Sequence, residues 1–407
     1  MEYLRWTKKL VNEALSERRV IVISGVRQSG KTTLTRQILS KNITYRTLDD
    51  TTIFSIAKQS PADFLKHDKK TMIIDEIQKV PELISEIKIV VDNNNRYGQF
   101  ILTGSADIFA LPQVTESLAG RVKNIRLRTL TEGEILGTKP NFFEKILKRK
   151  IPSQIEGYDK KKILELAIRG GYPEVVLLPQ KSRKGWYRDY LNTLIIRDLK
   201  NIANIRRAGV LNKLISILAA WSSKYINTDE ICSYLEISKN TLKEYINLLE
   251  HLYLFERVPA WTKTDYDKVG KKDKIYMSDT GLMTSILNWH YDEIELNSDR
   301  CGKLVETMIF KELVTLVDLN PEYSLYQYRD GKKREIDFII ETENNEIIAI
   351  EVKSGSKVTF DDFKHIKWFR DNLVKNKKFT GIILYTGQNT FPFGKDLLCV
   401  PMALLWS

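Results

Sequence analysis

Short apolar runs, each bounded by polar residues or glycine, recur through the first third of the chain. Five of these runs are rich in β-branched or aromatic residues, and they cover residues 19–24, 42–48, 70–75, 99–105 and 122–127. Segments with helical spacing lie between the runs, the clearest being residues 32–39 directly after the first run. Strands that alternate with helices in this way predict a parallel, doubly wound α/β sheet.

The middle of the chain has a helical pattern. Glycine and proline interrupt the chain at residues 137–140, and a lysine-rich stretch with helical periodicity follows. Apolar residues then recur at helical spacing between residues 186 and 221. We therefore place a domain boundary near residue 138 and expect an all-helical region after it.

Residues 228–250 predict two short amphipathic helices with a break at 236–238, and residues 253–258 alternate like a wing strand. Thr228 and Ser238 are the expected N-caps. This pattern predicts a winged helix-turn-helix, either as a DNA reader or as a domain that packs as a lid or oligomer contact. In a DNA-binding version the tip of the second helix would carry Lys239, Asn240, Thr241 and Lys243.

The last third combines helices with a hairpin. A helix over 302–310 precedes two strands, 334–341 and 346–353, joined by an asparagine turn, and a helix over 360–369 and a strand over 379–385 follow. The whole chain is thus expected to be an α/β protein of three parts. Their predicted boundaries are 1–138 for the P-loop sheet, 139–290 for the helical and winged-helix region, and 291–407 for the C-terminal α/β domain.

The glycine-rich segment after the first strand carries the most specific chemistry. Residues 25–32 read Gly-Val-Arg-Gln-Ser-Gly-Lys-Thr and fit G-x-x-x-x-G-K-[ST] between a strand and a helix. Backbone N–H groups of such a loop cradle a polyphosphate, the lysine reaches the β- and γ-phosphates, and the threonine holds Mg²⁺. A chance glycine loop is the alternative, and the flanking strand and helix argue against it. The predicted nucleotide-binding residues here are Gly25, Gln28, Ser29, Gly30, Lys31, Thr32 and Thr33.

Two further strand ends supply polar groups to the same site. Asp75 and Glu76 end an apolar run in the Walker B pattern, so Asp75 is expected to hold the Mg²⁺ shell and Glu76 to polarise the attacking water. Thr103 and Ser105 end the next run. Either hydroxyl could contact the γ-phosphate or the water, and either could instead cap a helix.

Arg121 precedes the fifth run. An arginine near the phosphates of its own or a neighbouring subunit would neutralise charge that develops in the transition state. A salt bridge to Glu116 or Glu132 is the structural alternative. We treat Arg121 as a candidate catalytic residue.

Taken together, these motifs resemble those of prokaryotic AAA-type ATPases that carry a C-terminal domain of unknown function. The resemblance rests on residues 25–32, 73–76, 102–105 and 116–121, and it continues through 169–174, 190–199 and 275–282. It implies ATP binding and an AAA-type fold. It implies no defined biological task.

A second chemical signature lies on the C-terminal hairpin. Asp337 followed by Glu351-x-Lys353 is the arrangement of the restriction-endonuclease-like fold, and Glu306 resembles the acidic residue that this fold supplies from its preceding helix. The carboxylates of Glu306, Asp337 and Glu351 could bind Mg²⁺ or Mn²⁺, and Lys353 could position a metal-bound water or stabilise the phosphate. Such domains also occur as binding modules, so cleavage and silent binding both stay open.

Charge and composition bear on partners. The chain has 407 residues and a net charge of +12, which favours a polyanion such as nucleic acid, DNA above RNA, although a lysine-rich protein with no such partner is the alternative. No apolar run is long enough to span a membrane, and the three cysteines show no pairing motif, so we expect a cytoplasmic protein.

Two functions follow from these patterns. The first is an ATPase coupled to a nucleic-acid-binding, metal-dependent nuclease. The second is a nucleotide-dependent regulatory or defence-associated switch whose nuclease-like domain is silent, with a homo-oligomer as its candidate assembly.

Overall fold

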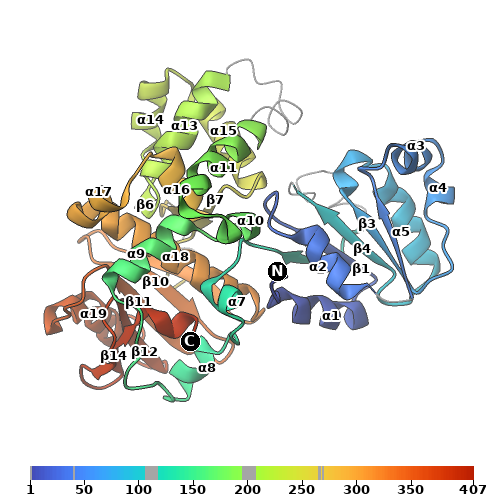
Figure 1. The fold of residues 1–407 in the computed structure, drawn as a ribbon. Coiled ribbons are helices and arrows are strands. Elements are labelled where there is room, and N and C mark those ends of the chain that lie inside the picture. The colour runs from blue at the N-terminus through green and yellow to red at the C-terminus, as the bar shows by residue number, and fades with distance from the viewer. Residues whose placement is uncertain (1, 40–41, 106–117, 195–207, 265–266, 268–269) are drawn as a thin grey trace. The chain divides into compact units, whose positions relative to one another are not determined.

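A computed structural model describes residues 2–39, 42–105, 118–194, 208–264, 267 and 270–407 (Figure 1). Glu116 and residues 195–199, which take part in the motifs above, lie outside the described residues. The chain forms two compact units. The first comprises Met1–Leu130 and Asn247–Leu254, and the second comprises Thr131–Ile246 and Phe255–Ser407.

The first unit contains a parallel five-stranded sheet in the order β2-β3-β4-β1-β5. All five predicted strands are present, as β1 (Val20–Ser24), β2 (Ile43–Thr47), β3 (Thr71–Asp75), β4 (Phe100–Gly104) and β5 (Val122–Arg126). The described helices of the unit's N-terminal part are α1 (Thr7–Glu17), α2 (Lys31–Ile38), α3 (Thr51–Gln59), α4 (Pro61–Phe64) and α5 (Leu83–Asn93).

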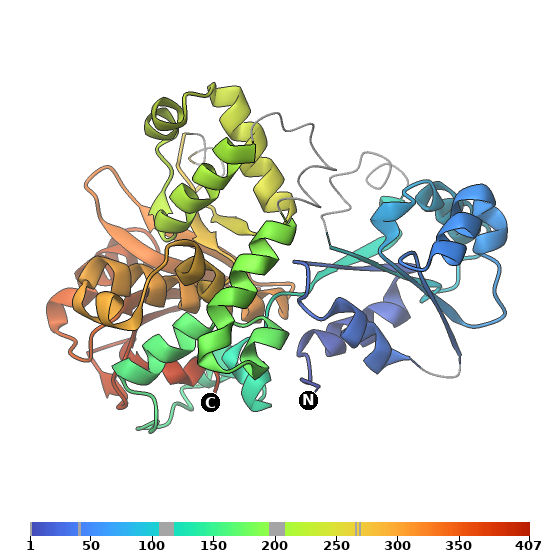
Figure 2. The ribbon, with the colours of Figure 1, turned by 45° about the horizontal axis from the view of Figure 1, so that its top comes forward.

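Helices cover both faces of this sheet (Figure 2). Val20 and Val22 pack into the core with α3, α4 and α5, whereas Ile21 and Ile23 pack into the core with α1 and α2. Alternate residues of one strand therefore enter opposite cores, which explains the continuous apolar run in the sequence. Full burial of each such side chain contributes about 1.5–3 kcal/mol.

Helices make up the first part of the second unit. They are α7 (Glu132–Leu136), α8 (Phe142–Leu147), α9 (Lys160–Arg169), α10 (Pro173–Leu177), α11 (Gln180–Thr193) and α13 (Ala208–Ala220), and α16 (Thr280–Ile286) and α17 (Tyr291–Leu296) follow later in the chain. The helical middle that the sequence predicts is therefore present.

A small antiparallel sheet and two helices follow α13. The sheet has the order β6-β8-β7, with β6 at Lys224–Tyr225, β7 at Phe255–Val258 and β8 at Lys274–Met277. The helices are α14 (Thr228–Leu235) and α15 (Lys239–His251). Ser238 caps α15, because its Oγ accepts the Thr241 N–H at 3.1 Å. The prediction that Thr228 is a cap is wrong, since it is the first helical residue and Asn227 precedes it at the cap position.

The C-terminal part of the second unit is a six-stranded mixed sheet in the order β13-β14-β12-β11-β10-β9. The predicted hairpin is present as β10 (Glu335–Glu341) and β11 (Ile347–Lys353), with Asn345 at φ 56° in its turn. β9 (Ser324–Arg329) pairs antiparallel with β10, and β12 (Phe379–Tyr385) pairs parallel with β11. The remaining elements are α18 (Ser298–Asp318), α19 (Lys364–Asn372), β13 (Phe391–Pro392) and β14 (Leu397–Pro401).

No helix in the described ranges has both the length and the apolar character that crossing a membrane requires. The three cysteines, Cys232, Cys301 and Cys399, are free thiols, and the last two are buried.

Candidate nucleotide site and acidic cluster

The loop between β1 and α2 needs glycine at both ends. Gly25 has φ 145°, and a Cβ atom there would lie 2.1 Å from the carbonyl oxygen of Leu127. Gly30 has φ 96° and occupies the N-cap position of α2. Because side chains are excluded at these positions, the loop backbone is left open to a ligand at the N-terminus of a helix.

Lys31 lies inside this loop and is 6% exposed. Its Nζ donates to the carbonyl oxygens of Gly25 and Val26 at 2.8 and 2.9 Å, so the ammonium is held where phosphate oxygens can replace those carbonyls. Ser29 is buried, and its hydroxyl has no hydrogen-bond partner among the described residues. Gln28 and Thr33 are exposed at the rim of the loop.

Asp75 is the centre of the polar groups beside the loop. β4 lies between β1 and β3, so the end of β3 faces the first turn of α2 across the end of β4. Asp75 Oδ2 accepts from Thr32 Oγ1 at 3.1 Å and from the Tyr45 hydroxyl at 2.7 Å, and Asp75 Oδ1 accepts from Thr103. Burial, reinforced by Asp75, raises the pKa of Tyr45, which therefore stays a proton donor.

Glu76 follows directly in the left-handed conformation, with φ 60°. Its N–H donates to Thr103 Oγ1 at 3.3 Å, and its Oε2 accepts from Gln78 and from Ser105 Oγ at 3.3 Å. Thr103 and Ser105 thus orient the two carboxylates. Tyr45 and Gln78 belong to no motif; the pairing of β2 with β3 places Tyr45 here, and Gln78 follows Glu76 by two residues.

Arg121 lies away from these groups. Its Nε and Nη2 donate to the two oxygens of Asp92 at 2.5 and 3.0 Å, whereas Glu132, one of the two expected partners, pairs with Arg169. Val122 pairs with Val20 in the parallel register, so Arg121 is at the amino edge of the sheet, whereas the phosphate loop follows Ser24 at the carboxyl edge. A strand of this length spans about 16 Å. The predicted role of Arg121 at the phosphates is therefore open only for a nucleotide bound to a neighbouring subunit.

The chemistry of these donors fits Mg-ATP. The glycine loop and the orphaned Ser29 hydroxyl suit phosphate oxygens, and Thr32 and Asp75 already share the position where a hydrated Mg²⁺ would sit. Glu76 is tied to the same group, because Thr103 Oγ1 accepts its N–H and donates to Asp75.

The second unit brings together all four residues of the C-terminal signature. Glu306 comes from α18, Asp337 from β10, and Glu351 and Lys353 from β11. Phe338 pairs with Ile350, so Asp337 lies beside Glu351, and Asp337 Oδ2 accepts the Val352 N–H at 2.9 Å. Lys353 Nζ lies 3.4 Å from Glu351 and 3.5 Å from Asp362.

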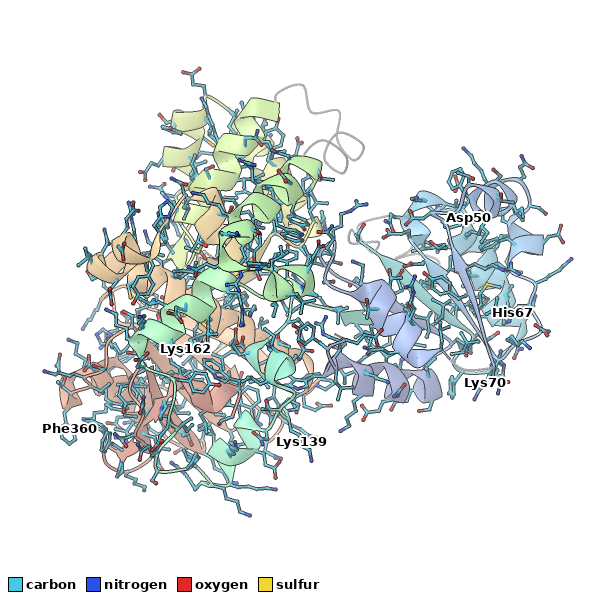
Figure 3. The ribbon with its side chains drawn as sticks, in the orientation of Figure 1. Asp50, His67, Lys70, Lys139, Lys162 and Phe360 are labelled. Carbon is cyan, nitrogen blue, oxygen red and sulfur yellow. The ribbon has the colours of Figure 1, made fainter. Side chains whose placement is uncertain are left out.

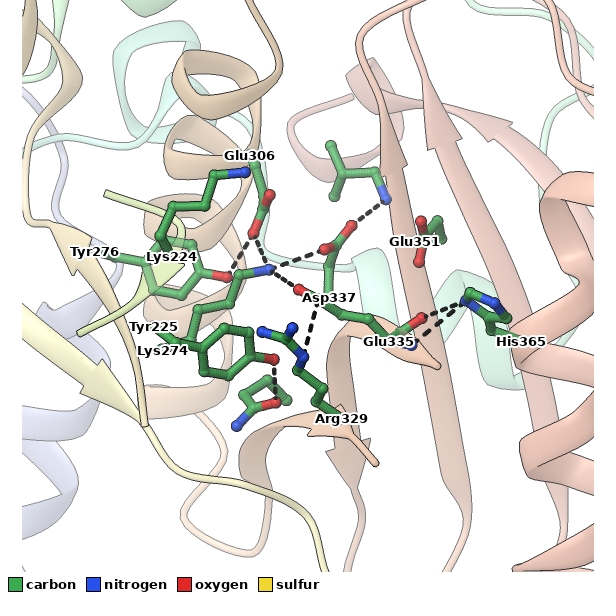
Figure 4. A network of polar contacts seen from close by, with 12 residues as sticks. Lys224, Tyr225, Lys274, Tyr276, Glu306, Arg329, Glu335, Asp337, Glu351 and His365 are labelled. Carbon is green, nitrogen blue, oxygen red and sulfur yellow. Dashed lines mark hydrogen bonds and ion pairs between the residues drawn. The ribbon is translucent and has the colours of Figure 1, made fainter. Parts of the chain in front are cut away.

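Lys274 enters this cluster from β8 (Figure 4). Its Nζ lies 2.8 Å from Glu306, 2.9 Å from Glu335 and 3.1 Å from Asp337, and the residue is only 2% exposed. The Tyr276 hydroxyl donates to the same Glu306 oxygen at 2.7 Å. No sequence motif points to Lys274, and the only local signal is a lysine that opens an otherwise apolar strand.

Burial and mutual charge perturb the pKa values of the cluster. Burial, with repulsion from Asp337, raises the pKa of Glu306 to about 7 and outweighs the pull of Lys274. Burial and Asp337 likewise hold the pKa of Glu351 well above its ordinary value. Burial lowers the pKa of Lys274, but Glu306, Tyr276, Asp337 and Glu335 together raise it well above the usual range, so the ammonium stays charged.

In the described arrangement, protein donors already contact the carboxylates that a divalent metal would use. Within the described part of the chain, no set of three or more histidine, cysteine, aspartate or glutamate side chains is arranged to hold an ion. Both oxygens of Asp337 already have a donor, one from Lys274 and one from Val352. The predicted metal ligands Glu306, Asp337 and Glu351 are thus near one another, but a protein cation balances them.

The second unit also has a basic cavity of about 740 Å³ between α9, α11, α16 and α17. Lys162 on α9, labelled in Figure 3, is one of the residues that line this cavity. The cavity is lined by six cationic residues but only two acidic ones, Glu165 and Asp292. The cationic residues are Lys161, Lys162, Arg169, Lys181, Arg183 and Lys184. No carboxylate of the described residues pairs with Arg183, and burial, then Arg169, lower the pKa of Arg183. Trp289 and Tyr291 add aromatic surface.

Comparison with known families defines the class of the first unit. Residues 17–136 match the family described as the AAA domain, which, with the phosphate loop and the parallel sheet, makes this part an AAA-type P-loop ATPase domain. Residues 160–293 and 301–405 match two families, each described as a domain of unknown function (DUF8612 and DUF4143). These two descriptions state no activity.

Full-length relatives do not add a function. An uncharacterised protein of Mycobacterium tuberculosis is 24% identical over 394 residues, which covers 96% of this chain and 82% of the relative. An uncharacterised protein of Methanocaldococcus jannaschii is 28% identical over 349 residues, or 82% of this chain and 74% of the relative. Among solved structures, the Thermotoga maritima RuvB Holliday junction branch migration motor is 19% identical, covers 62% of this chain and 89% of its own, and has a TM-score of 0.28, too low to carry an argument.

Proposed function

We propose that this protein is an ATP-driven switch that binds nucleic acid through its second unit, where a restriction-endonuclease-like domain is catalytically silent. The proposal rests on the position of Thr32, Asp75 and Glu76 together beside the phosphate loop. In the acidic cluster of the second unit, a lysine ammonium already contacts the carboxylates. Three free cysteines accord with action in the reducing cytoplasm.

Hydrolysis would use the first unit's own side chains. Thr32 and Asp75 would hold a Mg²⁺ ion, which when bound would supply positive charge to neutralise the phosphates. Lys31 would leave the carbonyl oxygens of Gly25 and Val26 for phosphate oxygens, and Thr32 and Asp75 would exchange their mutual hydrogen bond for the metal shell. Glu76, oriented by Gln78 and Ser105, would accept a proton from the attacking water.

Three observations support nucleic acid as the partner. α18 and strands β9, β10, β11 and β12 follow the order and pairing of a restriction-endonuclease-like core, with three antiparallel strands and a fourth parallel to the third. The elements from α13 to β8 follow the order of a winged helix, with Asn240 and Lys243 exposed on α15. The basic cavity is lined by six cationic residues, of which Arg169 pairs with Glu132, and by the rings of Tyr187, Trp289 and Tyr291.

Metal-dependent cleavage is the second candidate function. It is favoured by the complete set of Glu306, Asp337, Glu351 and Lys353 in one cluster, and it would require Lys274 to leave the carboxylates. DNA is the favoured substrate class in that case, with Mg²⁺ or Mn²⁺ as the ion.

One set of assays tests these proposals. Purified protein is incubated with ATP and with linear DNA, branched DNA or RNA, in Mg²⁺ or Mn²⁺, and ATP turnover, binding and cleavage are measured in parallel. We expect turnover to fall ~100-fold or more in Lys31→Ala and in Glu76→Gln, because the first loses phosphate contacts and the second loses the base. We also expect binding without cleavage.

The controls separate the alternatives. Cleavage that disappears in Lys353→Ala would establish the nuclease and refute the silent switch. Lack of binding to every nucleic acid tested would refute the proposed partner but leave the ATPase intact. Unchanged turnover in Glu76→Gln would refute its role as base.

A further inference from the structure

A lysine ammonium stands among the carboxylates that a restriction-endonuclease-like domain would use for a metal. We infer that Lys274 takes the place of the metal in this chain, as the built-in counter-ion of Glu306 and Asp337. The cluster consequently binds no divalent cation while Lys274 is present. The inference rests on the proposed restriction-endonuclease-like fold of this part of the second unit.

The contacts of Lys274 use the full donor capacity of the ammonium. A lysine ammonium has three N–H groups, and three carboxylates lie within 2.8–3.1 Å of it, those of Glu306, Glu335 and Asp337. An ordinary surface lysine gains little from one such contact. Three carboxylates from α18 and β10 converge on this one buried cation, in an arrangement that would otherwise surround a metal ion.

The acids are also engaged on their other sides. Asp337 Oδ2 accepts the Val352 N–H at 2.9 Å, and the Glu306 oxygen that contacts Lys274 also accepts the Tyr276 hydroxyl at 2.7 Å. Glu351, which Figure 4 shows on the far side of Asp337 from Lys274, lies 3.4 Å from Lys353. A metal would therefore have to displace protein donors rather than complete an open set of ligands.

The backbone holds Lys274 in this position. β8 is buried and pairs with β6 and β7, and the neighbouring Tyr276 ring stacks on Phe310 with centroids 4.4 Å apart. Gln327 of β9 donates to the carbonyl oxygen of Lys272 at 3.1 Å. If the ammonium left the carboxylates, it would be an uncompensated buried charge, which is strongly unfavourable.

Mn²⁺ binding to the full-length protein tests the inference without any enzymatic readout. Chelator-treated, nucleotide-free protein is titrated with Mn²⁺, and free Mn²⁺ is followed by electron paramagnetic resonance. We expect Asp337→Asn to leave the wild-type titration unchanged, since the cluster binds none. Lys274→Ala should gain about one Mn²⁺ per chain, and the double variant Lys274→Ala/Asp337→Asn should lose it.

Lys332→Ala, which removes an exposed lysine of the same unit, is the matched control and should bind no additional Mn²⁺. Lys274→Gln keeps an N–H donor toward the carboxylates and serves as the second variant if Lys274→Ala does not fold. Two results would overturn the inference: Mn²⁺ binding by wild-type protein that Asp337→Asn abolishes, or no gain in a folded Lys274 variant. Nucleic-acid binding is measured separately, so its absence would refute the proposed function and leave the Mn²⁺ result standing.

Discussion

At the scale of single residues, buried charge shapes both candidate sites. Lys31 and Asp75 are buried beside the phosphate loop, and Lys274 is buried among carboxylates. In each case hydrogen bonds or opposite charges offset the cost of removing the group from water. Glu312 on α18 is a third case.

Glu312 makes a pH-dependent contribution to stability. It is 1% exposed, accepts the Glu132 N–H at 3.1 Å and lies 3.4 Å from Lys311, while Arg169 pairs with Glu132. Burial, opposed by Lys311 and reinforced by Glu132, raises the pKa of Glu312 from 4.5 to about 7. The folded protein therefore binds this proton more tightly than the unfolded chain does, so the contribution is complete below pH 4.5 and is lost as the pH rises through 7.

We predict that Glu312→Gln removes this loss of stability at rising pH. The free energy of unfolding of the variant relative to wild type should rise between pH 5 and pH 8 by on the order of 2–3 kcal/mol. Urea denaturation followed by circular dichroism across that range measures the difference. Glu144→Gln, at an exposed position on α8, is the control and should follow the wild-type profile. Parallel profiles for Glu312→Gln and wild type would contradict the assignment.

At the scale of elements, Asp279 joins three helices of the second unit. Its Oδ1 caps α16 by accepting the N–H groups of Gly281 and Leu282 at 3.0 Å each. The same oxygen accepts the Tyr187 hydroxyl from α11 at 3.1 Å, and Oδ2 accepts the Gly171 N–H after α9 at 2.8 Å. This one carboxylate thus links α9, α11 and α16 through hydrogen bonds.

We predict that Asp279→Ala destabilises the second unit by about 2–4 kcal/mol, because a cap is lost and buried donors of Gly171 and Tyr187 are left unpaired. Chemical denaturation gives the value. Asp50→Ala is the matched control, since Asp50 (labelled in Figure 3) caps α3 through two N–H groups but is exposed, and it should cost only about 1 kcal/mol. Equal effects for the two variants would show that the buried contacts of Asp279 add nothing.

At the scale of the whole molecule, the charge of the chain is strongly positive. Lysine and arginine number 64 and the acids 52, which gives +12. The basic cavity of the second unit concentrates part of this excess where few acids balance it. Nucleic-acid affinity that depends on these cations must fall with salt, because phosphate contacts release condensed counterions.

We predict a steep fall of affinity with salt and a weaker dependence in Lys181→Ala/Arg183→Ala. If both side chains contact phosphates, the slope of log K against log salt should decrease in magnitude by about 2. Fluorescence anisotropy with labelled DNA at several salt concentrations measures both slopes. Lys58→Ala/Lys70→Ala removes the same charge from exposed positions of the first unit and should keep the wild-type slope. A flat wild-type response would refute electrostatic binding.

Local patterns in the sequence determined much of the molecule. The strands of the first sheet, the phosphate loop between Gly25 and Thr32, and the hairpin of β10 and β11 were all predictable, because side-chain periodicity and turn residues act over a few positions. The Ser238 cap was predictable for the same reason. The Thr228 cap was wrong by one position, as helix ends depend on which neighbouring groups are available.

Contacts between residues far apart in the chain were decided only by the tertiary structure. The neighbouring positions of β2, β3 and β4 in the sheet brought Tyr45, Asp75 and Thr103 together. The packing of β8 placed Lys274 against Asp337, 63 positions away, and turned an expected metal site into a cluster balanced by a protein cation. Sequence by itself determined which chemical groups the chain carries and which local elements present them. The contacts that these groups make depended on strand order and packing, because a buried charge pairs with whichever group the fold brings close to it.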